Sequence, residues 1–168
     1  MKEQLTFFKT EYERASTPTS CVFTGHRELG KDFSSRTLKK EIKKMMEAGV
    51  ENFYNGMAMG FDMLAAEHVL SLKKKFPNVK LIACVPCYGQ EKYFSETDKK
   101  RYAAILKKAD EVVTLSDHYY SGCMHNRDRY MVDRADIMIA YTRKAEGGAA
   151  YTVNYFIKTK NSDNIIYV

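Results

Sequence analysis

The sequence lacks a long apolar run and three familiar signatures of phosphate binding or catalysis. No apolar stretch in its 168 residues approaches the length that crosses a bilayer, and residues 1–5 carry charge where a signal peptide would begin. We therefore expect a cytoplasmic protein without membrane contact. There is no P-loop, no dinucleotide-binding glycine fingerprint and no nucleophile elbow, so those three routes to nucleotide binding or hydrolysis find no support.

Cysteine is also scarce, with four residues in the chain. This number, without a secretion signal, indicates reduced thiols. Cys84 and Cys87 have the spacing of half a zinc site, and Cys123 with His125 has the residue types for the other half. Cys84, however, falls inside a predicted buried strand, where a thiol packs as a small apolar side chain. We expect no metal site.

The composition is that of one globular domain, with 45% hydrophobic and 29% charged residues. The formal net charge of +6 suits an anionic ligand. Most basic residues are spread along predicted helices, which is typical of solvated helix faces. A nucleic-acid surface remains an alternative that we do not favour.

The chain divides into an N-terminal extension, residues 1–19, and a single domain, residues 20–168. Leu5, Phe8 and Tyr12 in the extension have the spacing of a short amphipathic helix. Beyond it, short apolar runs alternate with amphipathic helical segments. The predicted strands are residues 21–24, 52–54, 79–85, 112–115, 137–141 and 165–168.

This alternation predicts an α/β fold of the Rossmann-like, doubly wound type. We expect a mainly parallel sheet of about six strands, helices on both faces and a strand order near 3-2-1-4-5-6. The order would then reverse beside strand one. Because ligands of such sheets bind at the carboxyl ends of the strands, the loops that follow the strands are the candidate site.

The first of these loops contains Thr24, Gly25, His26 and Arg27. The glycine lets the backbone approach a ligand closely, and the guanidinium can hold a phosphate through two hydrogen bonds. Alternatively, Gly25 serves a turn, and His26 and Arg27 bond to loop carbonyls. Because ligand sites favour the reversal point, we give the two interpretations equal weight.

The second loop precedes a predicted helix and contributes Gly56, Met57, Ala58, Gly60 and Asp62. Small residues at a helix N-terminus expose backbone N–H groups, which attract anions. Asp62 has a simpler interpretation, because a carboxylate in the first turn complements the helix dipole.

Later loops supply further candidates. Glu91 follows the third strand, Arg127 lies on the fourth helix of the domain, and Gly147 and Gly148 open the last helix as a second anion-binding turn, with Thr152 in its first turns. An ion-pair network that fixes the fourth helix is the alternative role for its arginines. The candidates for acid–base catalysis are His26, Glu91, Asp133 and, in the second loop, Asp62.

Five motifs in chain order resemble one family. They are Thr-Gly-His-Arg at 24–27, Gly-x-Ala-x-Gly-Phe-Asp at 56–62, Gly-Gln-Glu at 89–91, Arg-x-Arg-Tyr-Met-Val-Asp at 127–133 and Gly-Gly-x-x-Tyr-Thr-Val at 147–153. This set resembles the YpsA/YoqJ-like branch of the SLOG superfamily, which includes the DNA-processing protein DprA and the cytokinin-activating LOG enzymes. The resemblance covers residues 21–168. It implies a Rossmann-like domain that binds a nucleotide or a nucleotide-derived ligand through the loops after strands one, two, four and five.

The chain departs from the LOG pattern at the last helix. LOG enzymes carry Pro-Gly-Gly-x-Gly-Thr-x-x-Glu, whose glutamate serves glycosidic-bond cleavage. Here Glu146 replaces the proline, Ala149 follows the two glycines where relatives often have threonine, and Asn154 stands where the glutamate would be. Because an amide is neither a general acid nor a base, these departures argue against phosphoribohydrolase activity of the LOG type.

Three functions follow as hypotheses. The leading one is a sensor or regulatory module that binds a small nucleotide or nucleotide derivative at the carboxyl edge of the sheet. The alternatives are a hydrolase that cleaves a nucleotide at its glycosidic or phosphate bond, and single-stranded DNA binding of the DprA kind. Tyr151 and Tyr155, at outward positions of the last helix, suggest a partner surface and leave a homo-oligomer open.

Overall fold

The computed structural model describes residues 19–168, and the helix expected around Leu5, Phe8 and Tyr12 lies outside them. The strands are β1 (Ser20–Gly25), β2 (Asn52–Asn55), β3 (Lys80–Val85), β4 (Glu111–Thr114), β5 (Ile137–Tyr141) and β6 (Ile165–Tyr167). The helices are α2 (Ser35–Glu47), α3 (Phe61–Leu72), α4 (Glu96–Lys108), α5 (Cys123–Asp133) and α6 (Gly148–Thr159). Three short 3-10 turns join them: η1 (Lys73–Lys75), η2 (Gln90–Tyr93) and η3 (Ser162–Asn164).

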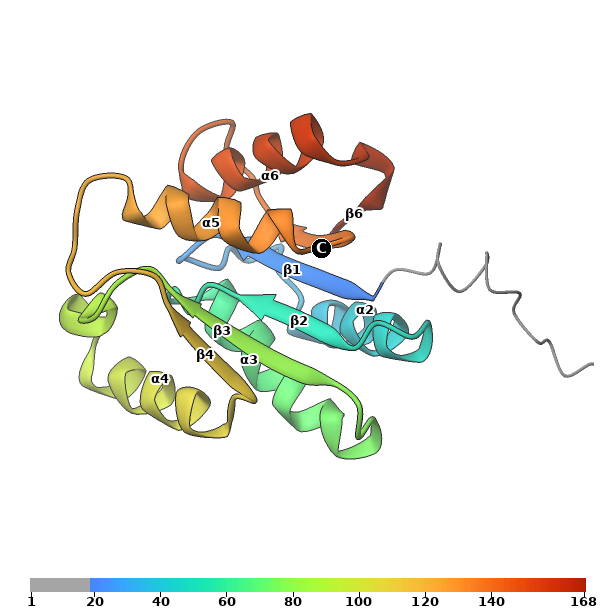
Figure 1. Ribbon diagram of the computed structural model, residues 1–168. Coiled ribbons are helices and arrows are strands. Elements are labelled where there is room, and N and C mark those ends of the chain that lie inside the picture. Colours follow the sequence, from blue (N-terminus) through green and yellow to red (C-terminus); the bar gives the residue numbers. More distant parts are fainter. Residues whose placement is uncertain (1–18) are drawn as a thin grey trace, which may run out of the picture.

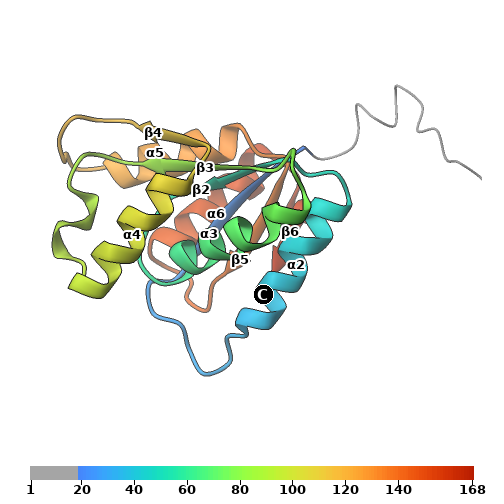
Figure 2. The ribbon, with the colours of Figure 1, turned by 90° about the horizontal axis from the view of Figure 1, so that it is seen from below.

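All six strands form one parallel sheet, which confirms the predicted Rossmann-like α/β class. Helices α2, α3 and α4 cover one face, and α5 and α6 cover the other (Figure 1; the lower face is seen in Figure 2). Buried apolar side chains fill both interfaces between sheet and helices. Within residues 19–168, no helix combines the length and apolar character that crossing a membrane demands.

The place of the fourth strand differs from the expected order. The observed order is β4-β3-β2-β1-β5-β6, so β4 lies outside β3 and β5 pairs with β1. Helix α4 packs beside α3 on the same face of the sheet, and a right-handed crossover on that face adds the next strand further outward. Exposed Glu111 and Val112 are consistent with an edge strand. The reversal still falls beside β1, as predicted.

Local capping explains where two helices begin. The Ser34 hydroxyl accepts a hydrogen bond from Thr37 N–H (3.2 Å) at the start of α2, and the Ser95 hydroxyl accepts one from Asp98 N–H (3.1 Å) at the start of α4. By contrast, α3 and α6 begin after glycines, Gly60 and Gly147, that have positive φ angles and no side chain to cap with. These two helices begin at the carboxyl edge, beside the candidate site.

Candidate functional site

The loops after β1 and β2 pack directly on each other through two glycines. A Cβ atom on Gly25 would overlap the Phe61 ring, and one on Gly60 would overlap the carbonyl oxygen of Arg27. Gly60 also has a φ of +75°, which other residues rarely adopt. Phe61 N–H donates to the His26 carbonyl (3.2 Å) across this contact. Gly25 and Gly60 therefore serve loop packing, and Gly25 does so as the last residue of β1, paired with Tyr141, rather than in a turn.

Arg127, expected to bind ligand, points inward from α5. Its Nε donates to Asp128 Oδ1 (2.7 Å), and its Nη1 donates to the carbonyls of Gly56 and Cys84. The Gly56 carbonyl also accepts from Gln90 Nε2 (3.0 Å). Only 7% of the Arg127 side chain is exposed. The guanidinium thus holds the loop after β2, and the ion-pair alternative describes it better than ligand binding does.

The start of α3 uses its N–H groups internally. Met57, fully buried with a φ of +58°, donates its N–H to Asn55 Oδ1 (2.8 Å), and Asn55 Nδ2 donates to the Asp62 carbonyl (2.7 Å). Ala58 N–H donates to Asp62 Oδ2 (3.3 Å). A carboxylate of the protein itself therefore occupies the position at which an anionic ligand was expected, so this turn is not an open anion site.

Asp62 is an unusual carboxyl group for this position. Burial raises its pKa from 3.8 to about 7, although the nearby positive charge of Arg127 and the bond from Ala58 N–H act in the opposite direction. Its Oδ1 atom is buried and has no hydrogen-bond partner among the described residues. Asp62 is thus a buried carboxyl group at the carboxyl edge of the sheet, and its surroundings disfavour the charged form.

The start of α6, in contrast, is open. An added Cβ atom on Gly147, whose φ is +102°, or on Gly148 would meet no atom of residues 19–168 within 4 Å. The first N–H groups of a helix have no intrahelical partner and carry the positive end of the helix dipole. This turn therefore offers the backbone donors that the second loop does not. Thr152 is not part of this surface, because it is buried and its Oγ1 donates to the Gly148 carbonyl (2.9 Å).

His26 connects the loop after β1 to the loop after β5. Its Nε2 accepts a hydrogen bond from Arg143 N–H (2.7 Å), which places the proton of the neutral ring on Nδ1. Partial burial lowers the His26 pKa, and the charges of Lys144 and Arg143 lower it further. Arg27 and Lys144 are exposed on these two loops and form no ion pair within residues 19–168, whereas Thr24 is buried in β1.

Three of the four acid–base candidates, His26, Glu91 and Asp133, do not meet in one site. Asp133 is the last residue of α5, which runs antiparallel to the strands, so it lies at the opposite edge of the sheet from His26. There its Oδ1 accepts from the Tyr155 hydroxyl (2.8 Å). Glu91 lies half-buried in η2, and its charge contributes to the raised pKa of Cys87. No hydrogen bond joins any two of the three in the described chain.

Two polar clusters at the carboxyl edge of the sheet were not predicted from the sequence. In the first, the Tyr141 hydroxyl accepts from Gly30 N–H (3.0 Å) and donates to Asp32 Oδ1 (3.3 Å), while Arg143 Nε donates to Asp32 Oδ2 (2.6 Å) and its guanidinium lies over the Tyr141 ring. This cluster anchors the loops after β1 and β5. A tyrosine ending a buried strand is the one sequence signal for it.

The second cluster joins α5 to α6. The rings of His125 and Tyr151 stack at 3.8 Å with 13° between their planes, and Arg129 Nη1 donates to the Tyr151 hydroxyl (2.7 Å). Tyr151 and Tyr155 were expected to face a partner. Both instead bond to α5 residues of the same chain, so they no longer indicate an oligomer.

Comparison with known proteins assigns the chain to a family. The model of the YpsA proteins, described as the YspA SLOG family, matches residues 21–167. The chain belongs to this family.

Among its family relatives, UPF0398 protein YpsA of Bacillus subtilis is 24% identical over 134 residues, which are 78% of this chain and 74% of the relative. A UPF0398 protein of Halalkalibacterium halodurans is 29% identical over 75% of this chain and 68% of its own length. The uncharacterized prophage-derived protein YoqJ of Bacillus subtilis is 29% identical over 64% of this chain and 70% of its own length.

Solved structures show the same fold in DNA processing protein A. The Helicobacter pylori protein, described with a single-stranded DNA binding mode, has a TM-score of 0.64 at 17% identity. The match covers 90% of this chain but 65% of that one. The Streptococcus pneumoniae protein also scores 0.64 at 17% identity, over 88% of this chain and 49% of its own. The chain therefore spans less than two thirds of either DNA processing protein.

Alanine substitutions of the glycines at the carboxyl edge should affect the free energy of unfolding unequally. Gly25→Ala and Gly60→Ala force overlap with Phe61 and the Arg27 carbonyl, so each should lower the free energy of unfolding by roughly 1–3 kcal/mol or more. Gly148→Ala enters open space and should change it by less than about 0.5 kcal/mol. Urea denaturation of the three variants measures this. Equal losses at all three positions would contradict the assignment.

Because the pKa of Asp62 is raised, we expect the free energy of unfolding to fall as the pH rises. Its contribution to stability is fully present below the ordinary pKa of 3.8 and is lost as pH rises through the folded value of about 7. Asp62→Asn removes this titration, so its stability relative to the wild type should rise by roughly 2–3 kcal/mol between pH 5 and pH 8. Denaturation at both pH values measures the change, with Asp117→Asn as an exposed control. A pH-independent difference for Asp62→Asn would show that the carboxyl group is not perturbed.

Proposed function

We propose that the protein binds a nucleotide or nucleotide-derived ligand at the carboxyl edge between β1 and β5 and acts as a sensor or regulatory module. The open start of α6 at Gly147 and Gly148 is the observation that supports this most strongly. It combines unoccupied backbone donors, the positive end of a helix dipole and space for a group such as a phosphate. It also lies at the reversal of strand order, where open α/β sheets bind ligands.

The charges around this turn favour an anion. Arg27 and Lys144 are exposed on the two adjoining loops, and the described residues provide neither with an ion-pair partner. A guanidinium and an ammonium on these two loops, together with the backbone N–H groups at the start of α6, are suited to the diphosphate or monophosphate of a nucleotide. The N–H groups of Met57 and Ala58 in the loop after β2 already have internal acceptors, so the phosphate is assigned to α6.

An aromatic surface beside the same turn supports a nucleobase. Tyr151 lies in the first turn of α6, where its N–H donates to the Gly147 carbonyl (2.9 Å), and it stacks on exposed His125. Stacked aromatic rings offer a base the flat contact that it favours. We place the base near His125 and the phosphate at Gly147–Gly148.

Binding is favoured over cleavage because the candidate catalytic groups are otherwise engaged or apart. His26 Nε2 already accepts the Arg143 N–H, and Asp133 lies at the other edge of the sheet. Asn154, at the LOG glutamate position, is exposed on α6 and is an amide. A general acid or base for glycosidic cleavage therefore has no counterpart at these positions.

Isothermal titration with AMP, ATP, NAD and ADP-ribose tests the proposal. The wild type should bind at least one of them, and Arg27→Ala should weaken that binding about 10-fold or more because a charge-assisted bond to phosphate is lost. Arg36→Ala, an exposed arginine on α2, should bind as the wild type does. No binding by the wild type, or equal affinity of Arg27→Ala and wild type, would overturn the proposal.

Single-stranded DNA binding is a second candidate, favoured by one observation. Four tyrosines stand exposed on the loops after β3 and β4: Tyr88 (67%), Tyr93 (86%), Tyr119 (69%) and Tyr120 (39%). Tyr88 N–H donates to the Ser116 carbonyl (3.3 Å), so these two loops adjoin. Exposed rings with basic neighbours are the usual platform for stacking unpaired bases.

This candidate predicts stacking and salt dependence. The wild type should bind a 20-nucleotide dT strand with an affinity that falls steeply with salt, and the double substitution Tyr93→Ala with Tyr119→Ala should weaken binding about 10-fold. Tyr167→Ala, exposed on β6, is the control. Fluorescence anisotropy measures all three proteins. Binding that ignores salt or the two tyrosines would remove this candidate.

A further inference from the structure

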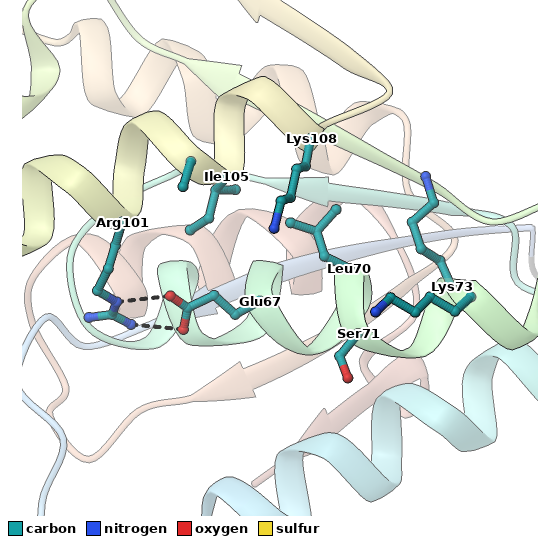
Figure 3. A pocket seen from close by; sticks show the side chains of 9 residues that line it. Glu67, Leu70, Ser71, Lys73, Arg101, Ile105 and Lys108 are labelled. Carbon is teal, nitrogen blue, oxygen red and sulfur yellow. Dashed lines mark hydrogen bonds and ion pairs between the residues drawn. The ribbon is translucent and has the colours of Figure 1, made fainter.

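A groove of about 660 Å³ lies between α3 and α4 on the outer side of the helix layer (Figure 3). The two helices follow neighbouring parallel strands, so they run parallel to each other. Each presents one face at spacings i, i+3, i+4 and i+7 to the groove: Glu67, Leu70, Ser71 and Lys74 from α3 and its end, and Arg101, Ala104, Ile105 and Lys108 from α4. The end of the groove lined by Lys74 and Lys108, its lysine end, lies at the C-terminal ends of the two helices and far from the candidate nucleotide site.

The charges of the groove are unequal at its two ends. Arg101 forms a two-bond pair with Glu67 (2.9 and 3.0 Å), which neutralises one end (Figure 3). At the other end, Lys74 and Lys108 are exposed and have no ion-pair partner within residues 19–168. Half-buried Leu70 and exposed Ala104 give the middle an apolar character, and Ile105, which also lines it, is buried. The groove therefore combines an apolar middle with a free positive end.

We propose that this groove binds an amphipathic helix of a partner protein that carries acidic residues near one of its ends. Two parallel helices form a trough that accepts a third helix with apolar side chains at i, i+3 or i+4, and i+7. Carboxylates on that helix lie against Lys74 and Lys108. This charge pairing favours the orientation that brings the acidic end of the helix to the lysine end of the groove.

The lining of the groove argues against nucleic acid as its occupant. None of the residues that line it is aromatic, so unpaired bases have no ring to stack on. The small side chains of Ser71 and Ala104 leave room for the apolar anchors of a helix. This inference does not depend on nucleotide binding, because the groove shares no residue with that site.

A designed peptide tests the proposal on the full-length protein. The probe is a fluorescein-labelled 16-residue helix with leucines at i, i+4, i+7 and i+11 and glutamates in its last two turns. Anisotropy should rise with protein concentration, and the affinity should fall as salt increases. Lys74→Glu with Lys108→Glu should weaken binding 10-fold or more. Ala104→Trp, which fills the groove, should do the same.

Matched controls separate the groove from general charge and surface effects. Lys40→Glu with Lys107→Glu makes the same charge change at exposed positions outside the groove, and Ala103→Trp adds the same ring on α4 outside it. Both should bind within about 2-fold of the wild type, and a probe with lysines in place of its glutamates should not bind. The proposal is overturned if the wild type does not bind, if the lysine probe binds equally, or if groove and control variants bind alike. Displacement of the probe by a dT oligonucleotide, but not by unlabelled peptide, would assign the groove to nucleic acid and also overturn it.

Discussion

The buried guanidinium of Arg127 holds the carboxyl edge of the sheet together. From α5 it reaches the carbonyls of Gly56 and Cys84, at the ends of β2 and β3, while Asp128 balances its charge. A buried cation is tolerated when its donors and its charge are both satisfied, and its loss would leave carbonyls and a carboxylate without partners. Helix α5, on one face of the sheet, is thereby tied to the loop after β2, which leads to α3 on the other face.

This constraint determines where a ligand has room. The loop after β2 is closed by Arg127, Asn55 and Asp62, so its N–H groups and small residues serve the protein itself. Within residues 19–168, the start of α6 has no such internal partner and faces open space. Of two similar glycine-rich helix starts, one is therefore structural and the other is free to bind, which concentrates the proposed site between β1 and β5. The α3–α4 groove lies apart from it and offers a separate surface.

Much of the fold was predictable because it depends on local pattern. Short apolar runs located each strand of the described residues, and Gly147 with Gly148 marked the start of α6 correctly. The place of β4 was not predictable, because it depends on which face of the sheet α4 covers. The roles of Gly25, Gly60 and Arg127 depend on contacts with distant residues, and a glycine that packs against Phe61 looks in sequence like one that meets a ligand. The separation of Asp133 from His26 likewise follows from the direction of α5.

The most direct measurement maps the ligand onto backbone amides. In a ¹H–¹⁵N NMR titration with the tightest-binding nucleotide, we expect the largest shifts on the amides of Gly147, Gly148 and Ala149, with smaller ones near Arg27. The amides of Met57 and Ala58, whose N–H groups already have internal acceptors, should move little. The largest shifts at Gly56–Gly60, or none at Gly147–Ala149, would contradict it.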